Sequence, residues 1–127
     1  MNTNLNRLAA GLAFIIGVMA IFAGGQVLLG KDPGYFVINW LPVYNFTVGV
    51  ITVFTTAALI WTRSRQALPV ALGTFGAHAL VMFILQSAYH DVVAMESVVA
   101  MSIRLIIWMI ILGLLFFTRY RVHAHTV

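Results

Sequence analysis

The chain has 127 residues, of which 62% are apolar and 8% are charged, and its net charge is +4. A soluble domain has roughly 45–50% apolar and about 25% charged residues, and a small globule cannot bury so large an apolar excess. We therefore expect lipid to surround most of the surface. The chain has no cysteine, which excludes disulfides, thiolate metal sites and cysteine catalysis.

Four long apolar runs predict four membrane-spanning helices in a single domain. Each run is close to the roughly 20 residues that a helix needs to cross a bilayer. The first run is too long for the apolar region of a signal peptide, so it is interpreted as a helix. Short loops favour antiparallel neighbours, and the predicted fold is an all-α, up-down, integral membrane four-helix bundle. The expected spans cover residues 8–29, 42–61, 67–88 and 97–117.

The links between the spans have their own expected features. The apolar and aromatic segment 35–41 is expected to be re-entrant or to lie on the membrane surface, with Trp40 at the interface. The basic tail 119–127, which contains His123 and His125, is expected to be flexible. Glycines are expected where helices approach closely. These are Gly11, Gly17, Gly24 and Gly25 in the first span and Gly73 and Gly76 in the third.

The distribution of basic residues predicts the orientation. Five of the seven lie at chain positions that share one side of the membrane, namely Arg7, Arg63, Arg65, Arg119 and Arg121. Lys31 and all three acidic residues lie in or beside the loops of the other side. Basic residues that flank spans stay in the cytoplasm, so we expect an inner-membrane protein with both termini cytoplasmic. This placement also explains the positive charge without nucleic-acid binding.

Arg104 lies inside the fourth span, roughly 12 Å from its outer end at about 1.5 Å per residue. A charge near the bilayer centre costs about 2.5–3.5 kcal/mol and usually faces the interior of a bundle with a partner. The alternative is that the side chain extends to the interface. Glu96 is too far along the helix to pair directly with Arg104, unless the side chain of Arg104 extends to the interface.

Each span places one strongly polar residue in the outer half of the membrane, and these four are Gln26, Asn45, Gln86 and Arg104. Glu96 is expected above them as a rim. Such residues mark a binding or transport site, or hold helices together. Asn45 also begins a helical stripe with Gly49, Thr52 and Thr56. We expect those threonines to pack with their hydroxyls on backbone carbonyls.

His78 is the one histidine at mid-depth in the third span. Haem usually needs two histidines on facing helices, and no other span contains one, which argues against haem. A structural histidine bonded to a Thr52 or Thr56 hydroxyl is the favoured interpretation. The sequence lacks a phosphate-binding glycine loop and a His-Glu metal motif, so we expect no metal site and no catalytic residue.

The first span contains the glycine-punctuated run from Gly11 to Gly17, and the second span and the loop after it contain Val48-Gly49 and Trp61-Thr62-Arg63. With these motifs the chain resembles, over most of its length, the DoxX/DoxD-like group of small four-helix membrane proteins. Members often have an acidic residue where Asn45 or Phe46 stands here. The resemblance implies an association with respiratory or redox membrane complexes and with quinones.

Three functions follow as hypotheses. The first is a non-enzymatic protein that uses the outer polar residues to bind a quinone-like or lipid-like molecule or a partner subunit. The second is a small oligomeric transporter or channel, whose polar path would pass His78 and the threonines. The third is a haem-binding electron carrier that uses His78. The expected partners are the lipid bilayer, further copies of the chain or a larger membrane complex.

Overall fold

The fold is an all-α bundle of four membrane-spanning helical stretches, seen in a computed structural model that describes residues 2–126 and the side chains of residues 4–118. The helices are α1 (Asn2–Leu28), α2 (Leu41–Ile51), the π-helical η1 (Thr52–Thr56), α3 (Ala57–Trp61), α4 (Ala67–Ser87) and α5 (Met95–Thr126). The segments α2, η1 and α3 follow one another without a break and form the second span. Among the described residues, four stretches are long and apolar enough to cross a membrane. The chain is a multi-pass membrane protein.

The span boundaries agree with the prediction at most ends. Pro42 lies in the first turn of α2. Backbone N–H groups in the first turn have no partner within the helix, so a proline is tolerated there. The fourth helix differs, because α5 continues to Thr126. The prediction of a flexible tail for residues 119–127 was therefore wrong for the backbone up to Thr126. The side chains of His123 and His125 lie outside the described residues.

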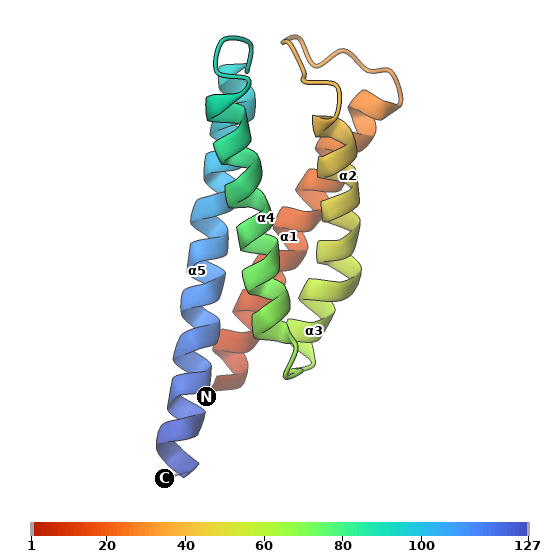
Figure 1. Ribbon diagram of the computed structural model, residues 1–127. Helices are drawn as coiled ribbons and strands as arrows, with labels where there is room; N and C mark the ends of the chain where they lie inside the picture. Colours follow the sequence, from red (N-terminus) through yellow and green to blue (C-terminus); the bar gives the residue numbers. More distant parts are fainter. Residues whose placement is uncertain (1, 127) are drawn as a thin grey trace.

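Helix α1 is the centre of the packing, with α2 on one side and α5 on the other, while α4 packs on α5. Both termini lie at the same end of the bundle, called here the inner end (Figure 1). The close backbone contacts of the second span with α4 come from η1 and α3, and α2 and α4 diverge towards the opposite, outer end (Figure 1). Side chains and a loop therefore fill the outer part of the bundle between α2 and α4.

The contact between α1 and the second span is close enough to exclude side chains. A Cβ atom on Gly49 would lie 2.8 Å from the carbonyl oxygen of Gly17 and from the amide nitrogen of Ile21. A Cβ atom on Gly24 would lie 2.5 Å from the carbonyl oxygen of Pro42. Gly17 and Gly24 thus lie where two helices approach closely, as predicted. The prediction was wrong for Gly11, Gly73 and Gly76, where an added Cβ would meet nothing within 4 Å.

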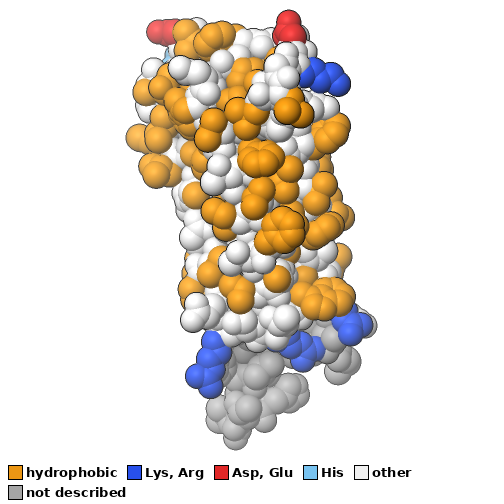
Figure 2. Space-filling view, turned by 90° about the vertical axis from the view of Figure 1, so that its right-hand side faces the viewer, with side chains coloured by type: hydrophobic (Ala, Val, Ile, Leu, Met, Phe, Trp, Pro, Cys, Tyr) orange, Lys and Arg blue, Asp and Glu red, His pale blue; other side chains and the backbone are white. Residues whose placement is uncertain are grey.

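Two apolar clusters fill the bundle. The inner one surrounds Trp108 and includes Ala9, Ala13, Ile60 and Leu115. The outer one joins Ile38 of the loop before α2 to residues of α4 and α5, namely Val81, Leu85 and Met101. Segment 35–40 is thus a loop that packs onto the outer end of the bundle. On the face shown in Figure 2, large apolar side chains form a band without Lys, Arg, Asp or Glu.

Candidate functional site

A buried arginine and an asparagine from another helix form the centre of the candidate site. Arg104 of α5 is only 6% exposed, and its Nη1 atom donates a hydrogen bond to Oδ1 of Asn45 on α2 over 2.5 Å. Tyr44 of α2 and Tyr35 of the preceding loop lie near the guanidinium. Arg104 therefore faces the bundle and has a partner, as the interpretation as a structured polar site requires.

The partner of Arg104 is neutral. The structure gives no carboxylate within salt-bridge distance of Arg104 among the described side chains, where the ion pair recorded is His90 with Asp91 at 3.4 Å. Glu96 is exposed at the outer end of α5. A guanidinium has five N–H donors, and the described hydrogen bonds use one of them. The cluster keeps a buried positive charge with donors available to a further acceptor.

His78 extends this cluster towards the middle of the membrane. Its ring is 2% exposed, and its Nδ1 atom lies 2.9 Å from the hydroxyl oxygen of Tyr44. The two rings meet edge to face at 86°, with their centroids 5.8 Å apart. On its other side the ring of His78 lies 6.4 Å from that of Trp108, whose buried Nε1 has no hydrogen-bond partner among the described residues.

The expected partner of His78 was wrong, because Tyr44 takes the place proposed for a threonine. The hydroxyl of Thr52 donates to the carbonyl oxygen of Val48 at 2.6 Å, as predicted for packing threonines. Thr56 instead lies 3.4 Å from the hydroxyl of Thr74 on α4. The stripe does face inwards, since Gly49, Thr52 and Thr56 are all buried.

A pair of aromatic residues covers the outer side of the cluster. The indole Nε1 of Trp40 donates to the hydroxyl of Tyr89 at 3.0 Å, and the rings meet edge to face with centroids 5.9 Å apart. This contact joins the loop before α2 to the end of α4. Together with the buried Ile38, it anchors this loop on the outer end of the bundle.

A groove on α2 lies beside the cluster on the lipid-facing side. It has a volume of about 410 Å³, which falls in the usual range for small-molecule sites. Tyr44 belongs both to this groove and to the hydrogen-bonded cluster. The groove is lined by Trp40, Val43, Tyr44, Thr47, Val48 and Ile51.

The structure brings together some of the residues singled out in the sequence. Arg104 and Asn45 are in contact, and His78 joins them through Tyr44. Gln26 is half-buried on α1, and Gln86 and Glu96 are exposed near the outer ends of α4 and α5. The sequence analysis missed Tyr44 and Trp108. The position of Tyr44 directly before Asn45 was the available indication.

The described residues contain no group of three or more His, Cys, Asp or Glu side chains placed to hold a metal ion. Comparisons of this chain with family models, curated proteins and solved structures find no match.

Proposed function

We propose that this chain binds an amphipathic quinone-like or lipid-like molecule, whose polar head accepts hydrogen bonds from Arg104 in the outer half of the bundle. The observation that carries the proposal is a buried guanidinium whose one described hydrogen-bond partner, Asn45, is a neutral amide. A buried charge is costly unless its hydrogen bonds are made. A head group with carbonyl, carboxylate or phosphate oxygens supplies the missing acceptors through charge-assisted bonds.

The groove on α2 supplies a place for the apolar tail. Its apolar walls are open to lipid, and Tyr44 forms the boundary between the groove and the polar cluster. In our proposal the ligand enters from the membrane with its tail along α2 and its head past Tyr44 towards Arg104. The resemblance to DoxX/DoxD-like proteins remains part of the proposal and is the reason to test a quinone first.

The inner half of the bundle favours a binding site over a transport path. Below His78 the space between the helices is filled by an apolar cluster that includes Trp108, Ile111 and Leu115. The buried polar side chains of this half, Asn6, Thr56 and Thr74, are already hydrogen-bonded within the protein. An ion or polar solute crossing this layer would therefore find few groups to replace its water. In our proposal the chain is a binding subunit and has no catalytic residue.

The orientation is also part of the proposal. We place the protein in an inner membrane with both termini in the cytoplasm, which puts the Arg104 cluster in the outer leaflet. The support is the basic end seen in Figure 2 together with the tendency of basic residues to stay on the cytoplasmic side.

Ligand retention by the purified protein tests the proposal. The protein in mild detergent is incubated with decylubiquinone in one arm and with oleic acid in the other, then separated from excess ligand, and the bound ligand is measured by mass spectrometry. We expect saturable retention of at least one probe near one molecule per chain. The two arms distinguish a quinone head from a carboxylate head.

The variants Arg104→Gln and Lys31→Gln form the matched comparison, because each removes one positive charge. A hydrogen bond to a charged group contributes about 1.5–3 kcal/mol, so Arg104→Gln should weaken retention about tenfold or more. Lys31 is exposed in the loop at the outer end, and its variant should behave like the wild type. Equal retention by Arg104→Gln and the wild type, or no saturable retention of either probe, would overturn the proposal.

A further inference from the structure

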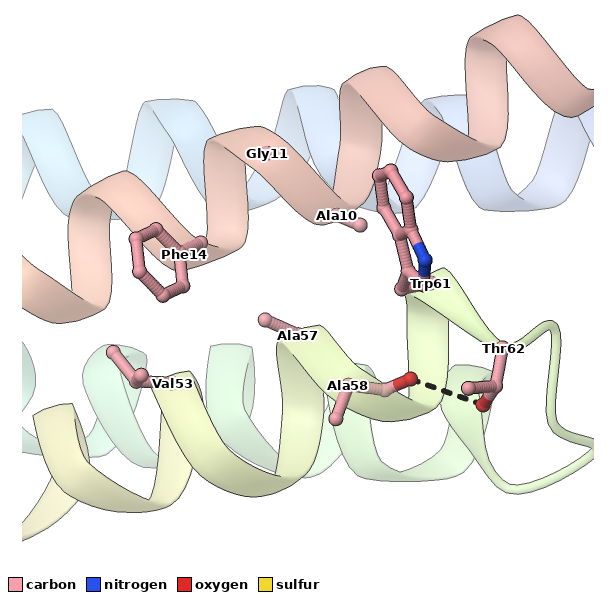
Figure 3. Close-up of a pocket in the computed structure, with 8 residues that line it drawn as sticks. All are labelled: Ala10, Gly11, Phe14, Val53, Ala57, Ala58, Trp61 and Thr62. Carbon is pink, nitrogen blue, oxygen red and sulfur yellow. Dashed lines mark hydrogen bonds between the residues drawn. The ribbon is translucent and has the colours of Figure 1, made fainter.

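A second groove lies at the inner end of the bundle, far from the Arg104 cluster. It runs between α1 and the segments η1 and α3 and has a volume of about 400 Å³. Phe14 and Trp61 stand towards its two ends, and small residues leave the space between them open (Figure 3). The full lining is Ala10, Gly11, Phe14, Val53, Ala57, Ala58, Trp61 and Thr62. The walls are almost entirely apolar and suit a hydrocarbon chain.

Basic residues gather at the end of this groove that is nearest to the membrane surface. The guanidinium of Arg7 lies over the ring of Trp61, 5.4 Å from its centroid, and Trp61 is itself part of the lining. Arg63 and Arg65 lie in the turn that directly follows Thr62, and both are exposed. The acidic residues Asp32, Asp91 and Glu96 all belong to the outer end, so no carboxylate neutralises these arginines among the described residues.

The backbone at Arg63 adds a second observation. Arg63 follows the end of α3 with a φ of 58°, in the left-handed region. Glycine is the usual residue at this point after a helix, because an L side chain there is strained. Strained backbone positions cluster at functional sites, and here the strained residue is an arginine beside an apolar groove.

We infer that this groove binds an anionic phospholipid of the adjacent leaflet, with one acyl chain between Phe14 and Trp61. The phosphate is held by the arginine cluster, defined as Arg7, Arg63 and Arg65. The charge of the cluster selects an anionic head group, since a zwitterionic lipid offers the same chain with a nearby positive charge. Arginine binds phosphate in a fixed bidentate geometry, and Trp61 has the amphipathic ring that suits the interface. This inference is independent of the ligand proposed beside Arg104.

The test is lipid selection by the purified full chain. The protein in mild detergent is equilibrated with equal amounts of phosphatidylglycerol and phosphatidylcholine that carry the same acyl chains, and bound lipids are counted by native mass spectrometry. We expect phosphatidylglycerol to be retained preferentially. Equal retention of the two lipids by the wild type would overturn the inference.

Charge variants locate the head group. Arg7→Gln and Arg63→Gly should each lower the preference for phosphatidylglycerol about fivefold, the equivalent of about 1 kcal/mol per basic residue near an anionic surface. Lys31→Gln removes the same charge at the outer end and should leave the preference unchanged. Arg63→Gly also relieves the backbone strain, so its melting temperature should not fall and misfolding would not explain a loss. An equal loss in Lys31→Gln would show a net-charge effect and overturn the site.

A filling variant locates the acyl chain. A Cβ atom at Gly11 meets nothing within 4 Å, so the side chain of Gly11→Leu can occupy the groove without a backbone clash. Gly73 is equally open on α4, outside the groove, which makes Gly73→Leu the matched control. Gly11→Leu should reduce retention of phosphatidylglycerol, while Gly73→Leu should not. Unchanged retention in Gly11→Leu would overturn the inference that the groove holds the chain.

Discussion

Nη1 of Arg104 donates to Oδ1 of Asn45 over 2.5 Å, and the two residues stand 59 positions apart in the chain. Helix α2 packs mainly on α1, so this bond links α2 to α5 across the outer half of the bundle. It also fixes the guanidinium within the membrane instead of letting it extend to the surface. The stability of the outer half should therefore depend on both residues together.

A double-mutant cycle measures this dependence. Asn45→Leu leaves the buried guanidinium without its acceptor and should cost about 1–3 kcal/mol of unfolding free energy. Arg104→Met alone leaves the amide unsatisfied, whereas the double variant removes both polar groups. We expect a coupling energy of about 0.5–3 kcal/mol from unfolding experiments in detergent. Strictly additive effects of the two substitutions would contradict a direct interaction.

The hydrogen bond between Tyr44 and His78 predicts a second effect on stability. Tyr44→Phe removes the hydroxyl and leaves Nδ1 of the buried ring without its partner, at a cost of about 1 kcal/mol. His78→Gln keeps a donor and an acceptor and should lose less stability than His78→Leu. His90 is exposed, so His90→Gln is the control and should leave the melting temperature unchanged. A Tyr44→Phe variant as stable as the wild type would argue against this bond.

The number of histidines predicts that the purified protein is colourless. His78 is the one histidine within the described membrane-spanning stretches. A haem held by a single chain would lack a second histidine ligand. A visible absorption spectrum checks this expectation. A Soret band that disappears in both His78→Gln and His78→Leu would favour the electron-carrier hypothesis instead.

The glycine contacts predict opposite results for two conservative substitutions. Gly49→Ala places a methyl group 2.8 Å from backbone atoms of α1, and α1 must move away to accommodate it. We expect a loss of about 1–3 kcal/mol, as for other cases of overpacking. Gly73→Ala meets open space, and alanine is the better helix former by about 1 kcal/mol, so it should be neutral or stabilising. Thermal unfolding of both variants distinguishes these outcomes.

The orientation is tested by cysteine labelling, which the chain permits because it has no native cysteine. Asp91→Cys and Gln66→Cys place single thiols in exposed loops at the outer and inner ends. In intact cells a membrane-impermeant maleimide should label Asp91→Cys and not Gln66→Cys. After the cells are opened, both variants should react. The reverse pattern in intact cells would invert the proposed orientation.

The sequence predicted which spans exist because each has the length and apolarity that a bilayer requires. It predicted less about which face of each helix is buried, since apolar residues suit both lipid and the bundle interior. Polar residues were the better guide. Thr52, His78 and Arg104 all lie within spans and are all buried, because lipid offers them no hydrogen bonds. Gln86 lies near a helix end and is exposed, so a polar residue predicts a buried face less well there.

The partners of those polar residues were harder to predict. That Tyr44 and not Thr52 reaches His78 depends on the relative rotation of α2 and α4, which no local pattern specifies. The packing of Ile38 onto α4 and α5 likewise depends on the divergence of two helices that are distant in sequence. Tyr44 resembled an ordinary interfacial aromatic residue, so its role became apparent only with the three-dimensional arrangement.

The π-helical segment η1 has a consequence for how this chain tolerates insertions and deletions. Each residue turns an α-helix by about 100°, and a π-helical segment accommodates one residue more than an α-helix of the same length. Deleting one residue within Thr52–Thr56 would therefore return the segment to α-helix while α2 and α3 keep their relative phase, and Tyr44 and Asn45 would still face His78 and Arg104. The same deletion between Thr74 and His78, in the uninterrupted α-helix α4, would rotate the residues on one side of it by about 100° relative to those on the other. The segment η1 thus gives the second span a place where a residue can be lost without separating Arg104 from Asn45.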